Sequence, residues 1–281
     1  VMNQAAPASL ERDVRPMPLA LTIAGFDPSS GAGISADLKV FAAHRVYGMA
    51  CITALTVQST LGVRRVEAVA PAVLRETLEC LCEDALPDGV KIGMLATAEN
   101  VGEVVAFLAS SRMAREKIVL DPVIRSSSGR ELLSPEGISR VRSELLAQVG
   151  WITPNLDELA VLTQQTRPLR REDVPPVAAE LHRAYPHLHI LVTGGHLDRP
   201  DDFLFLPSGG SFWFQGDRVE TTSTHGTGCA LSSALLCALM SGRRPQEAVR
   251  HAKNYVTGAL KAAFPTGRGR GPMHHLFQCN F

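Results

Sequence analysis

The sequence of 281 residues predicts an α/β fold, with a central, mostly parallel sheet covered by helices on both faces. Short apolar segments rich in β-branched residues alternate with segments of helical spacing along most of the chain. Hydrophobic residues make up 45% of the sequence, which is enough for a sizeable core. There is no fixed-period repeat and no linker, so we expect a single domain over residues 19–281, after a flexible polar tail of residues 1–18.

The first half of the chain predicts three strands, each followed by a helix. Leu19–Ala24 is an apolar run with a β-branched centre, and it leads into the glycine-rich turn of residues 25–33. Pro71 suits the first turn of the second helix. The expected strands with their helices are 19–24 with 35–44, 49–57 with 71–82, and 90–95 with 98–108.

The second half continues the alternation and ends in two helices. We expect strand 117–121 with helix 135–146, strand 151–153 with helix 156–162, helix 174–185 with strand 189–193, and the helices 229–240 and 246–264. Residues 203–214, interrupted at 207–210, predict a hairpin, which is the only antiparallel signal in the sequence.

Charge and cysteine content exclude several classes of protein. The net charge is +0, from 28 basic and 28 acidic residues, whereas nucleic-acid-binding proteins usually have a basic excess. The six cysteines lack the density of a disulfide-stapled secreted domain. No apolar run reaches the roughly 20 residues that a membrane helix needs, and the first residues lack a signal-peptide core. We therefore expect a cytoplasmic protein without nucleic-acid or membrane partners.

Polar and glycine residues collect directly after the predicted strands. In parallel α/β sheets, ligands bind beyond the carboxyl ends of the strands, so these residues are the candidates for a site. They are Gly25–Gly33, Gln58, Met94, Asp121–Ser128, Asn155–Glu158, Gly194–Gly195 and His225–Cys229.

The segment His225–Cys229 precedes a helix that is apolar nearly all round and must therefore be buried. The free N–H groups and the dipole at such a helix start favour an anion, and glycines let a phosphate come close. A glycine-rich cap on a core helix would give the same pattern. At the helix start the Cys229 thiol should have a pKa below the usual ~8.5, and it could act as a proton acceptor or as a donor in an anion hole.

Other candidates have a structural alternative as well as a chemical one. Asp121 and Glu158 follow two different strands and could hold Mg²⁺, although each could equally be a turn or helix-start carboxylate. The amide of Gln58 offers a donor and an acceptor side by side, as pairing with an aminopyrimidine edge requires, or it could be a surface amide. Lys253 could reach a nucleotide phosphate or extend to solvent. Asp37 could simply satisfy a helix dipole.

The motifs, taken together, resemble the ribokinase-like kinases, and within them the hydroxymethylpyrimidine/phosphomethylpyrimidine kinases of thiamine biosynthesis. The resemblance runs from about Leu19 to His275. It rests on segments 20–25, 27–33, 36–39, 91–95, 120–123, 132–135, 152–155 with Glu158, 194–196, 224–229 and 269–275.

This resemblance implies an ATP- and Mg²⁺-dependent kinase of a small-molecule pyrimidine, which forms a homodimer. The pyrimidine pocket would comprise Asp37, Gln58, Met94 and Val123, with the backbone of Gly25. Asp121 and Glu158 would organise Mg²⁺. Gly226, Gly228 and Cys229 would form the anion hole, and the nucleotide would contact Asn155, Thr193, Gly195, Thr227 and Lys253.

Two positions depart from the family pattern. Ser127 stands where the family commonly has lysine before Ser-Gly, and Thr193 stands where it commonly has lysine before Gly-Gly-His. Losing two cations should weaken neutralisation of a polyphosphate. Arg125 or Arg130 could replace the first lysine. We expect phosphorylation of the monophosphate to be the weaker activity.

Three alternatives remain open. The chain could be a pyridoxal or pyridoxine kinase of the same superfamily, or a non-catalytic pyrimidine or nucleotide sensor. An NAD-dependent oxidoreductase is the third, but residues 25–33 lack the GxGxxG spacing and no acidic residue follows at the ribose position.

Overall fold

A computed structural model describes residues 17–111, 113–126, 128–195 and 197–279. Most of the predicted N-terminal tail, residues 1–16, therefore lies outside the described residues. Within the described part of the chain, no helix is both long enough and apolar enough to cross a membrane.

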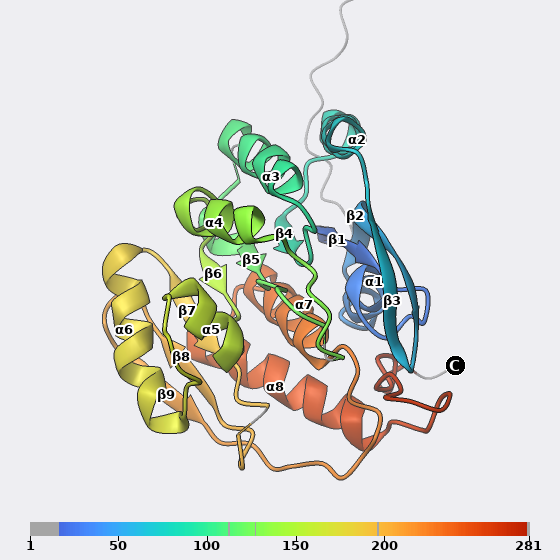
Figure 1. The fold of residues 1–281 in the computed structure, drawn as a ribbon. Helices are drawn as coiled ribbons and strands as arrows, with labels where there is room; N and C mark the ends of the chain where they lie inside the picture. Colours follow the sequence, from blue (N-terminus) through green and yellow to red (C-terminus); the bar gives the residue numbers. More distant parts are fainter. Residues whose placement is uncertain (1–16, 112, 127, 196, 280–281) are drawn as a thin grey trace, which may run out of the picture.

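The strands form one sheet of nine strands in the order β3-β2-β1-β4-β5-β6-β7-β8-β9 (Figure 1). Six are parallel, and they are β1 (Leu19–Phe26), β2 (Tyr47–Ser59), β4 (Gly89–Ile92), β5 (Ile118–Leu120), β6 (Trp151–Ile152) and β7 (His189–Val192). The antiparallel strands are β3 (Gly62–Ala68) at one edge, and β8 (Asp202–Phe205) and β9 (Ser211–Phe214) at the other. This arrangement confirms the predicted mostly parallel α/β fold and the late hairpin.

The prediction that the late hairpin is the only antiparallel element was wrong, because β2 and β3 form a second one. The β3 segment holds Arg64, Arg65 and Glu67, which are all exposed. An edge strand that faces solvent needs no apolar face, and charged residues protect it against pairing with other chains. Its sequence therefore lacks the apolar pattern that identified the inner strands.

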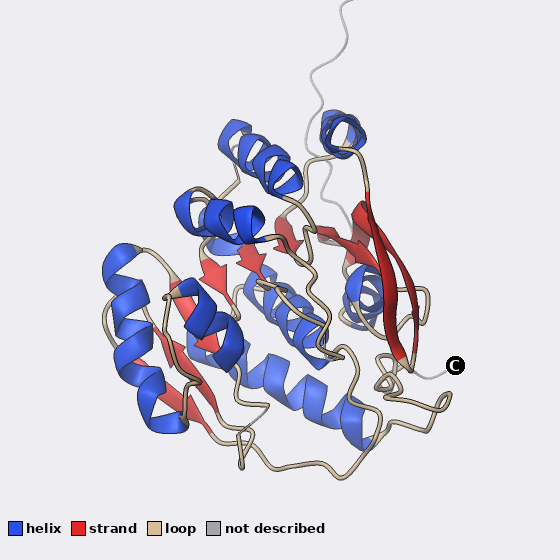
Figure 2. Cartoon of the chain, in the orientation of Figure 1, coloured by secondary structure: helices blue, strands red, loops and turns tan. Residues whose placement is uncertain are grey.

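The helices cover both faces of the sheet, as Figure 2 shows. One face carries α1 (Gly33–Ala43), α7 (Thr227–Met240) and α8 (Pro245–Lys261). The other face carries α2 (Pro71–Asp84), α3 (Ala98–Ser110), α4 (Pro135–Ser143), α5 (Leu156–Leu162) and α6 (Val174–Ala184). The predicted helix 135–146 is shorter than expected, because α4 ends at Ser143 and a 3₁₀ turn follows over Leu145–Ala147.

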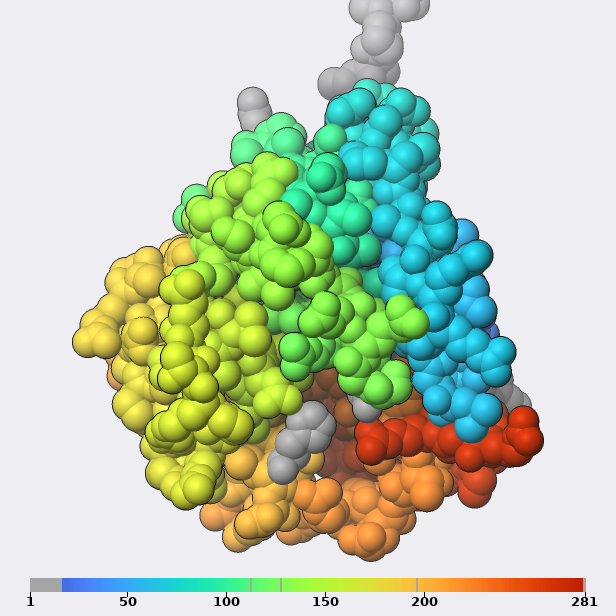
Figure 3. Space-filling model, in the orientation of Figure 1, coloured from blue at the N-terminus to red at the C-terminus, as the bar shows by residue number. Residues whose placement is uncertain are grey.

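Each face of the sheet has its own apolar core. Side chains alternate along a strand, so in β1 Leu21 and Ile23 pack with the second helix layer while Ala20 packs with α7 and α8. The carboxyl ends of the parallel strands meet at one edge of the sheet. In the space-filling view, the surface is hollowed below the green loop that follows β5, with atoms in the orange-red of the C-terminal helices at its base (Figure 3).

Candidate active site

The glycine loop after β1 is organised by the carboxylate of Asp27. This carboxylate accepts hydrogen bonds from the backbone N–H groups of Ser29 (2.8 Å), Gly31 (3.2 Å) and Ala32 (2.9 Å). It also accepts one from the Ser29 hydroxyl at 2.7 Å. Burial would raise the pKa of Asp27, but these bonds and the contact with His225 hold it below its ordinary value. Asp27 is thus an ionised side chain that shapes the loop.

The start of α7 lies directly against this loop. Gly226 precedes the helix with φ +80°, and a Cβ on it would lie 1.8 Å from the carbonyl oxygen of Gly31. Only glycine fits there, for both reasons. No side chain caps the helix, so its first N–H groups stay available for an anion. Gly228 is open as well, since a Cβ on it would meet only the carboxylate of Asp121, at 3.9 Å.

A buried ion pair lies beneath α7. Lys91 Nζ is 2.9 Å from Asp37 Oδ2, and neither side chain is exposed to solvent. The hydroxyls of Thr22 (2.6 Å) and Ser233 (2.8 Å) donate to the same carboxylate. Burial would lower the pKa of Lys91, but Asp37, Cys229 and Asp121 raise it above the ordinary value. Asp37 therefore holds a buried cation, and its predicted contact with the pyrimidine stays a prediction.

The Cys229 thiol lies in the same buried region, and its environment contradicts the predicted low pKa. Burial raises the pKa of Cys229 to about 12, and the carboxylates of Asp121 and Asp37 add to the effect. Lys91 and a hydrogen bond from the N–H of Gly33 oppose it without cancelling it. The helix start is too weak to offset burial beside two carboxylates. Cys229 is therefore a neutral thiol in this structure, and its two suggested roles, proton acceptor and donor in an anion hole, stay predictions.

Asp121 and Glu158 come together as predicted. Burial raises the pKa of Glu158 to about 8, and the Asp121 carboxylate adds to the shift. Burial likewise raises the pKa of Asp121, although Lys91 opposes it. Glu158 Oε2 also accepts from the N–H of Asn155 at 2.9 Å, and Asn155 Oδ1 accepts from the N–H of Glu158 at 2.9 Å, so the pair caps α5.

The predicted apolar residues of the pocket form one small cluster. Met94 is 8% exposed and packs with Ala54 and Leu132, and Val123 lies against them. A Cβ on Gly25 would lie 2.9 Å from Met94 Sδ, so glycine leaves the space that the thioether fills. The structure thus brings Gly25, Met94 and Val123 to one apolar wall at the ends of β1, β4 and β5.

Lys253 does not point freely towards a nucleotide. Its Nζ lies 2.6 Å from Asp202 Oδ2 and 2.6 Å from the carbonyl oxygen of Pro200. Asp202 Oδ1 in turn accepts from the N–H of Gly194 at 2.9 Å. Lys253 therefore connects, through Asp202, to the backbone after β7, and its contact with ATP stays a prediction.

The predicted nucleotide-binding residues Asn155 and Thr193 lie side by side, as an isolated parallel bridge joins them. Gly195 follows, and a Cβ on it would meet nothing within 4 Å, so this stretch of backbone is open to a ligand. Thr227 is the first residue of α7. The roles of these four residues in binding ATP remain predictions.

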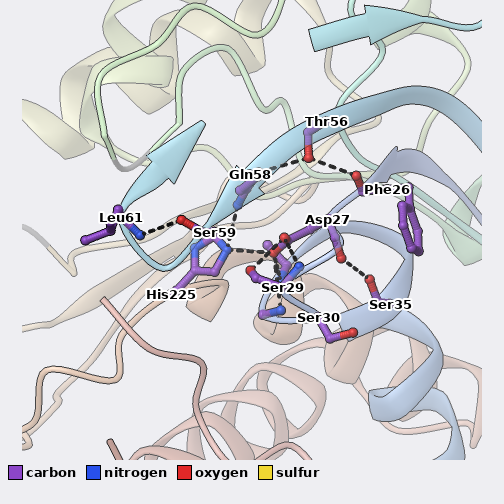
Figure 4. Close-up of polar contacts among 12 residues, drawn as sticks. Phe26, Asp27, Ser29, Ser30, Ser35, Thr56, Gln58, Ser59, Leu61 and His225 are labelled. Carbon is purple, nitrogen blue, oxygen red and sulfur yellow. Dashed lines mark hydrogen bonds and ion pairs between the residues drawn. The ribbon is translucent and has the colours of Figure 1, made fainter. Parts of the chain in front are cut away.

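Gln58 belongs to a chain of hydrogen bonds that links the β2 strand to the glycine loop (Figure 4). Its side-chain amide lies 3.0 Å from His225 Nε2, and His225 Nε2 lies 2.7 Å from Asp27 Oδ2. The ring of His225 also packs against Gly31, where a Cβ would lie 2.3 Å from ring atom Cδ2.

Sequence reasoning missed four residues in this region, namely Asp27, Lys91, His225 and Asp202. Asp27 and His225 lie inside segments that had been singled out, and their polar side chains beside glycines were the available signal. Lys91 carried a signal too, because a lysine in the middle of an apolar strand needs a buried partner. Nothing in the local pattern distinguishes Asp202 from its neighbour.

The arginines suggested as substitutes for the missing lysine are engaged elsewhere. Arg130 donates to the carbonyl oxygens of Val63 (3.1 Å) and Arg64 (2.6 Å) in β3. Arg125 lies 3.6 Å from Glu131 in an exposed ion pair. The suggested substitution of either arginine for the lysine stays a prediction, and Ser127 itself lies outside the described residues.

Known proteins of similar sequence indicate which family this chain belongs to. The family model described as phosphomethylpyrimidine kinase matches residues 27–274. The chain belongs to this family. It is 40% identical over 261 residues to the hydroxymethylpyrimidine/phosphomethylpyrimidine kinase of Escherichia coli K12, covering 92% of this chain and 97% of the relative. The enzyme of the same name from Aquifex aeolicus is 40% identical over 253 residues, which cover 89% and 97%.

Solved structures of family members and of pyridoxal kinases are also similar to this chain. The phosphomethylpyrimidine kinase of Clostridium difficile 630 has a TM-score of 0.75 and 36% identity, covering 87% of this chain and all (100%) of that one. The ADP complex of Bacillus subtilis pyridoxal kinase has a TM-score of 0.82 and 29% identity, covering 92% and 97%. The chain is therefore a kinase with a ribokinase-like fold, and its substrate is a small molecule.

Proposed function

We propose that this chain transfers the γ-phosphoryl group of ATP to 4-amino-5-hydroxymethyl-2-methylpyrimidine, and then phosphorylates the resulting monophosphate, in thiamine biosynthesis. The observation that carries the proposal is the uncapped start of α7 facing Asp121 across the open side of Gly228. Free N–H groups on one side and buried carboxylates on the other suit a polyphosphate with its metal ion. The membership of the chain in a phosphomethylpyrimidine kinase family supports the substrate.

In this proposal catalysis is mainly positioning and charge neutralisation. The N–H groups of Thr227, Gly228 and Cys229 would hold the transferred phosphoryl group, and the neutral thiol of Cys229 would line the same hole. The apolar wall of Met94 and Val123 would hold the pyrimidine ring against Gly25. The N–H groups after β7 would bind ATP from the other side, with Lys253 supported by Asp202.

The donor set fits Mg²⁺. Asp121 and Glu158 are two buried carboxylates whose pKa values are raised, so a divalent cation held by them would favour their ionised forms. Carboxylates supplemented by phosphate oxygens are the usual Mg²⁺ ligands. When bound, Mg²⁺ would neutralise charge on the phosphates.

A homodimer is supported by an exposed apolar strip on β1 and β2. Phe26 and Leu55 are partners in the sheet register, and Val57 lies two residues further on the same face. They are 36%, 50% and 49% exposed. Exposed apolar side chains that lie together in this way suit an interface with a second copy of the chain. Leu55→Glu should shift the molecular mass in solution from dimer to monomer.

The test of function is an assay of ADP release with the purified protein, ATP and Mg²⁺. Three substrates are compared, namely the hydroxymethylpyrimidine, its monophosphate and pyridoxine. We expect the highest kcat/KM for the hydroxymethylpyrimidine and a lower value for its monophosphate. The similarity to pyridoxal kinases makes pyridoxine the second candidate substrate, and a higher kcat/KM for pyridoxine would replace our proposal with that function.

A further inference from the structure

The side-chain amide of Gln58 has two possible orientations, and in one of them it cannot form all of the surrounding hydrogen bonds. With the amide nitrogen towards His225, the nitrogen is 3.0 Å from Nε2 of His225 and the amide oxygen is 3.2 Å from Thr56 Oγ1. Thr56 Oγ1 also lies 3.0 Å from the carbonyl oxygen of Phe26, which can only accept. The single hydroxyl proton of Thr56 would then have to serve two acceptors.

A second conflict arises at His225. Its Nε2 lies 2.7 Å from the carboxylate of Asp27, which accepts from four other donors and has a lowered pKa. An ionised carboxylate only accepts, so Nε2 must carry the proton and donate it. A protonated Nε2 has no lone pair left to accept from an amide N–H of Gln58.

Turning the amide by 180° removes both conflicts. His225 Nε2–H then points between Asp27 Oδ2 and the amide oxygen of Gln58, both of which accept. The amide N–H of Gln58 donates to Thr56 Oγ1, whose own proton goes to the carbonyl of Phe26. Every N–H and O–H then faces only acceptors, with the Nε2–H of His225 shared between two of them, and the orientation of an amide is properly assigned by such a network.

We propose that His225, held by Asp27, is a positioning residue that fixes the side-chain amide of Gln58 with its oxygen towards the imidazole. Thr56 holds the other end of the same amide. Each end keeps one free site, a lone pair on the oxygen and an N–H on the nitrogen. The amide then accepts on the His225 side and donates on the Thr56 side, which suits a heteroaromatic ring with an amino group beside a ring nitrogen.

The identity of the ligand in this inference rests on the proposed function, whereas the orientation of the Gln58 amide does not. His225 lies one residue before Gly226. Its ring therefore connects the Gln58 amide, which would bind the edge of the ligand ring, to the start of the anion hole. A ring edge with the opposite order of donor and acceptor would leave unpaired groups, which disfavours its binding.

The first test reads the imidazole directly and needs no substrate. Nitrogen-15 NMR of the labelled full chain, with the His225 signal assigned by its loss in His225→Phe, should show that Nε2 of His225 carries a proton. An Nε2 without a proton would overturn the proposal, whether or not the protein phosphorylates a pyrimidine. A failure of this inference can therefore be distinguished from a failure of the proposed function.

The second test measures specificity. His225→Phe keeps a ring against Gly31 but removes the donor, and Thr56→Val removes the acceptor at the other end, together with the hydrogen bond to the Phe26 carbonyl oxygen. Both variants should raise the KM for the aminopyrimidine about tenfold, which is the size expected when one hydrogen bond that orients the amide is lost. Both should also lower the preference of the protein for the aminopyrimidine over pyridoxine. The kcat should change by less than about threefold, because neither group touches the phosphoryl group.

The matched control is His251→Phe on α8, which removes another partly buried histidine whose Nε2 lies 3.0 Å from a polar partner, Nε2 of His44. Its preference between the two substrates should equal that of the wild type. If Thr56→Val keeps the wild-type KM and preference, the amide is not held as we propose, even where His225→Phe fails to fold.

Discussion

The pair of buried carboxylates makes a quantitative prediction about stability. Replacing Glu158 with Gln keeps the shape of the side chain and removes its charge. The pKa of Glu158 is raised to about 8 in the folded chain, against an ordinary value of 4.5. The folded protein therefore binds the proton more tightly than the unfolded chain, and stability is lost as the pH rises between these two values.

The size of the effect follows from the shift. From pH 6 to pH 8 the unfolded group is ionised while the folded group is largely protonated, which costs about 1.4 kcal/mol per pH unit. Since the folded group is half ionised at pH 8, the total loss is about 2 kcal/mol. The Glu158→Gln variant would also lose part of the cap with Asn155, which adds an offset of about 1 kcal/mol that does not depend on pH.

The assay is urea unfolding of wild type and Glu158→Gln at pH 6 and pH 8, with EDTA and without nucleotide. The free energy of unfolding of the wild type, relative to the variant, should fall by about 2 kcal/mol between the two pH values. Glu136→Gln, an exposed carboxylate in the first turn of α4, is the matched control and should follow the wild type. An unchanged difference between wild type and Glu158→Gln would refute the argument that burial sets this pKa.

Three further predictions follow from the buried charges and the thiol. Lys91→Met leaves Asp37 as an unpaired buried charge and should lower the free energy of unfolding in urea by about 3–5 kcal/mol. Adding Asp37→Asn to this variant should recover part of the loss, and equal stability of the single and double variants would contradict the buried ion pair. Cys229→Ala should lower kcat by about tenfold or more with a smaller change in substrate KM, measured by ADP release, and an unchanged kcat would remove Cys229 from the chemistry. Thr193→Lys should raise kcat/KM for the monophosphate more than for the unphosphorylated pyrimidine, and equal changes would show that position 193 does not affect the second step.

Local sequence determined the fold class and where the site lies. Strands such as β1 are buried on both faces, so their residues had to be continuously apolar, and a glycine turn had to follow where the chain leaves the sheet. The same constraint marked Gly25 and Asp121, because parallel strands all end at one edge, whereas Gly226 was marked by the buried helix that follows it. The exposed strand β3 escaped prediction, since an edge in solvent imposes no apolar pattern.

Only the tertiary structure decided how the side chains at that edge share charge and protons. The pKa of Cys229 follows from burial beside Asp121, which outweighs the helix start that the sequence shows. Lys253 is bound to Asp202, 51 positions away in the chain, and Gln58 is coupled to His225, 167 positions away. Burial and contacts of this range depend on how the strands are ordered in the sheet, and no local pattern of residues contains that information.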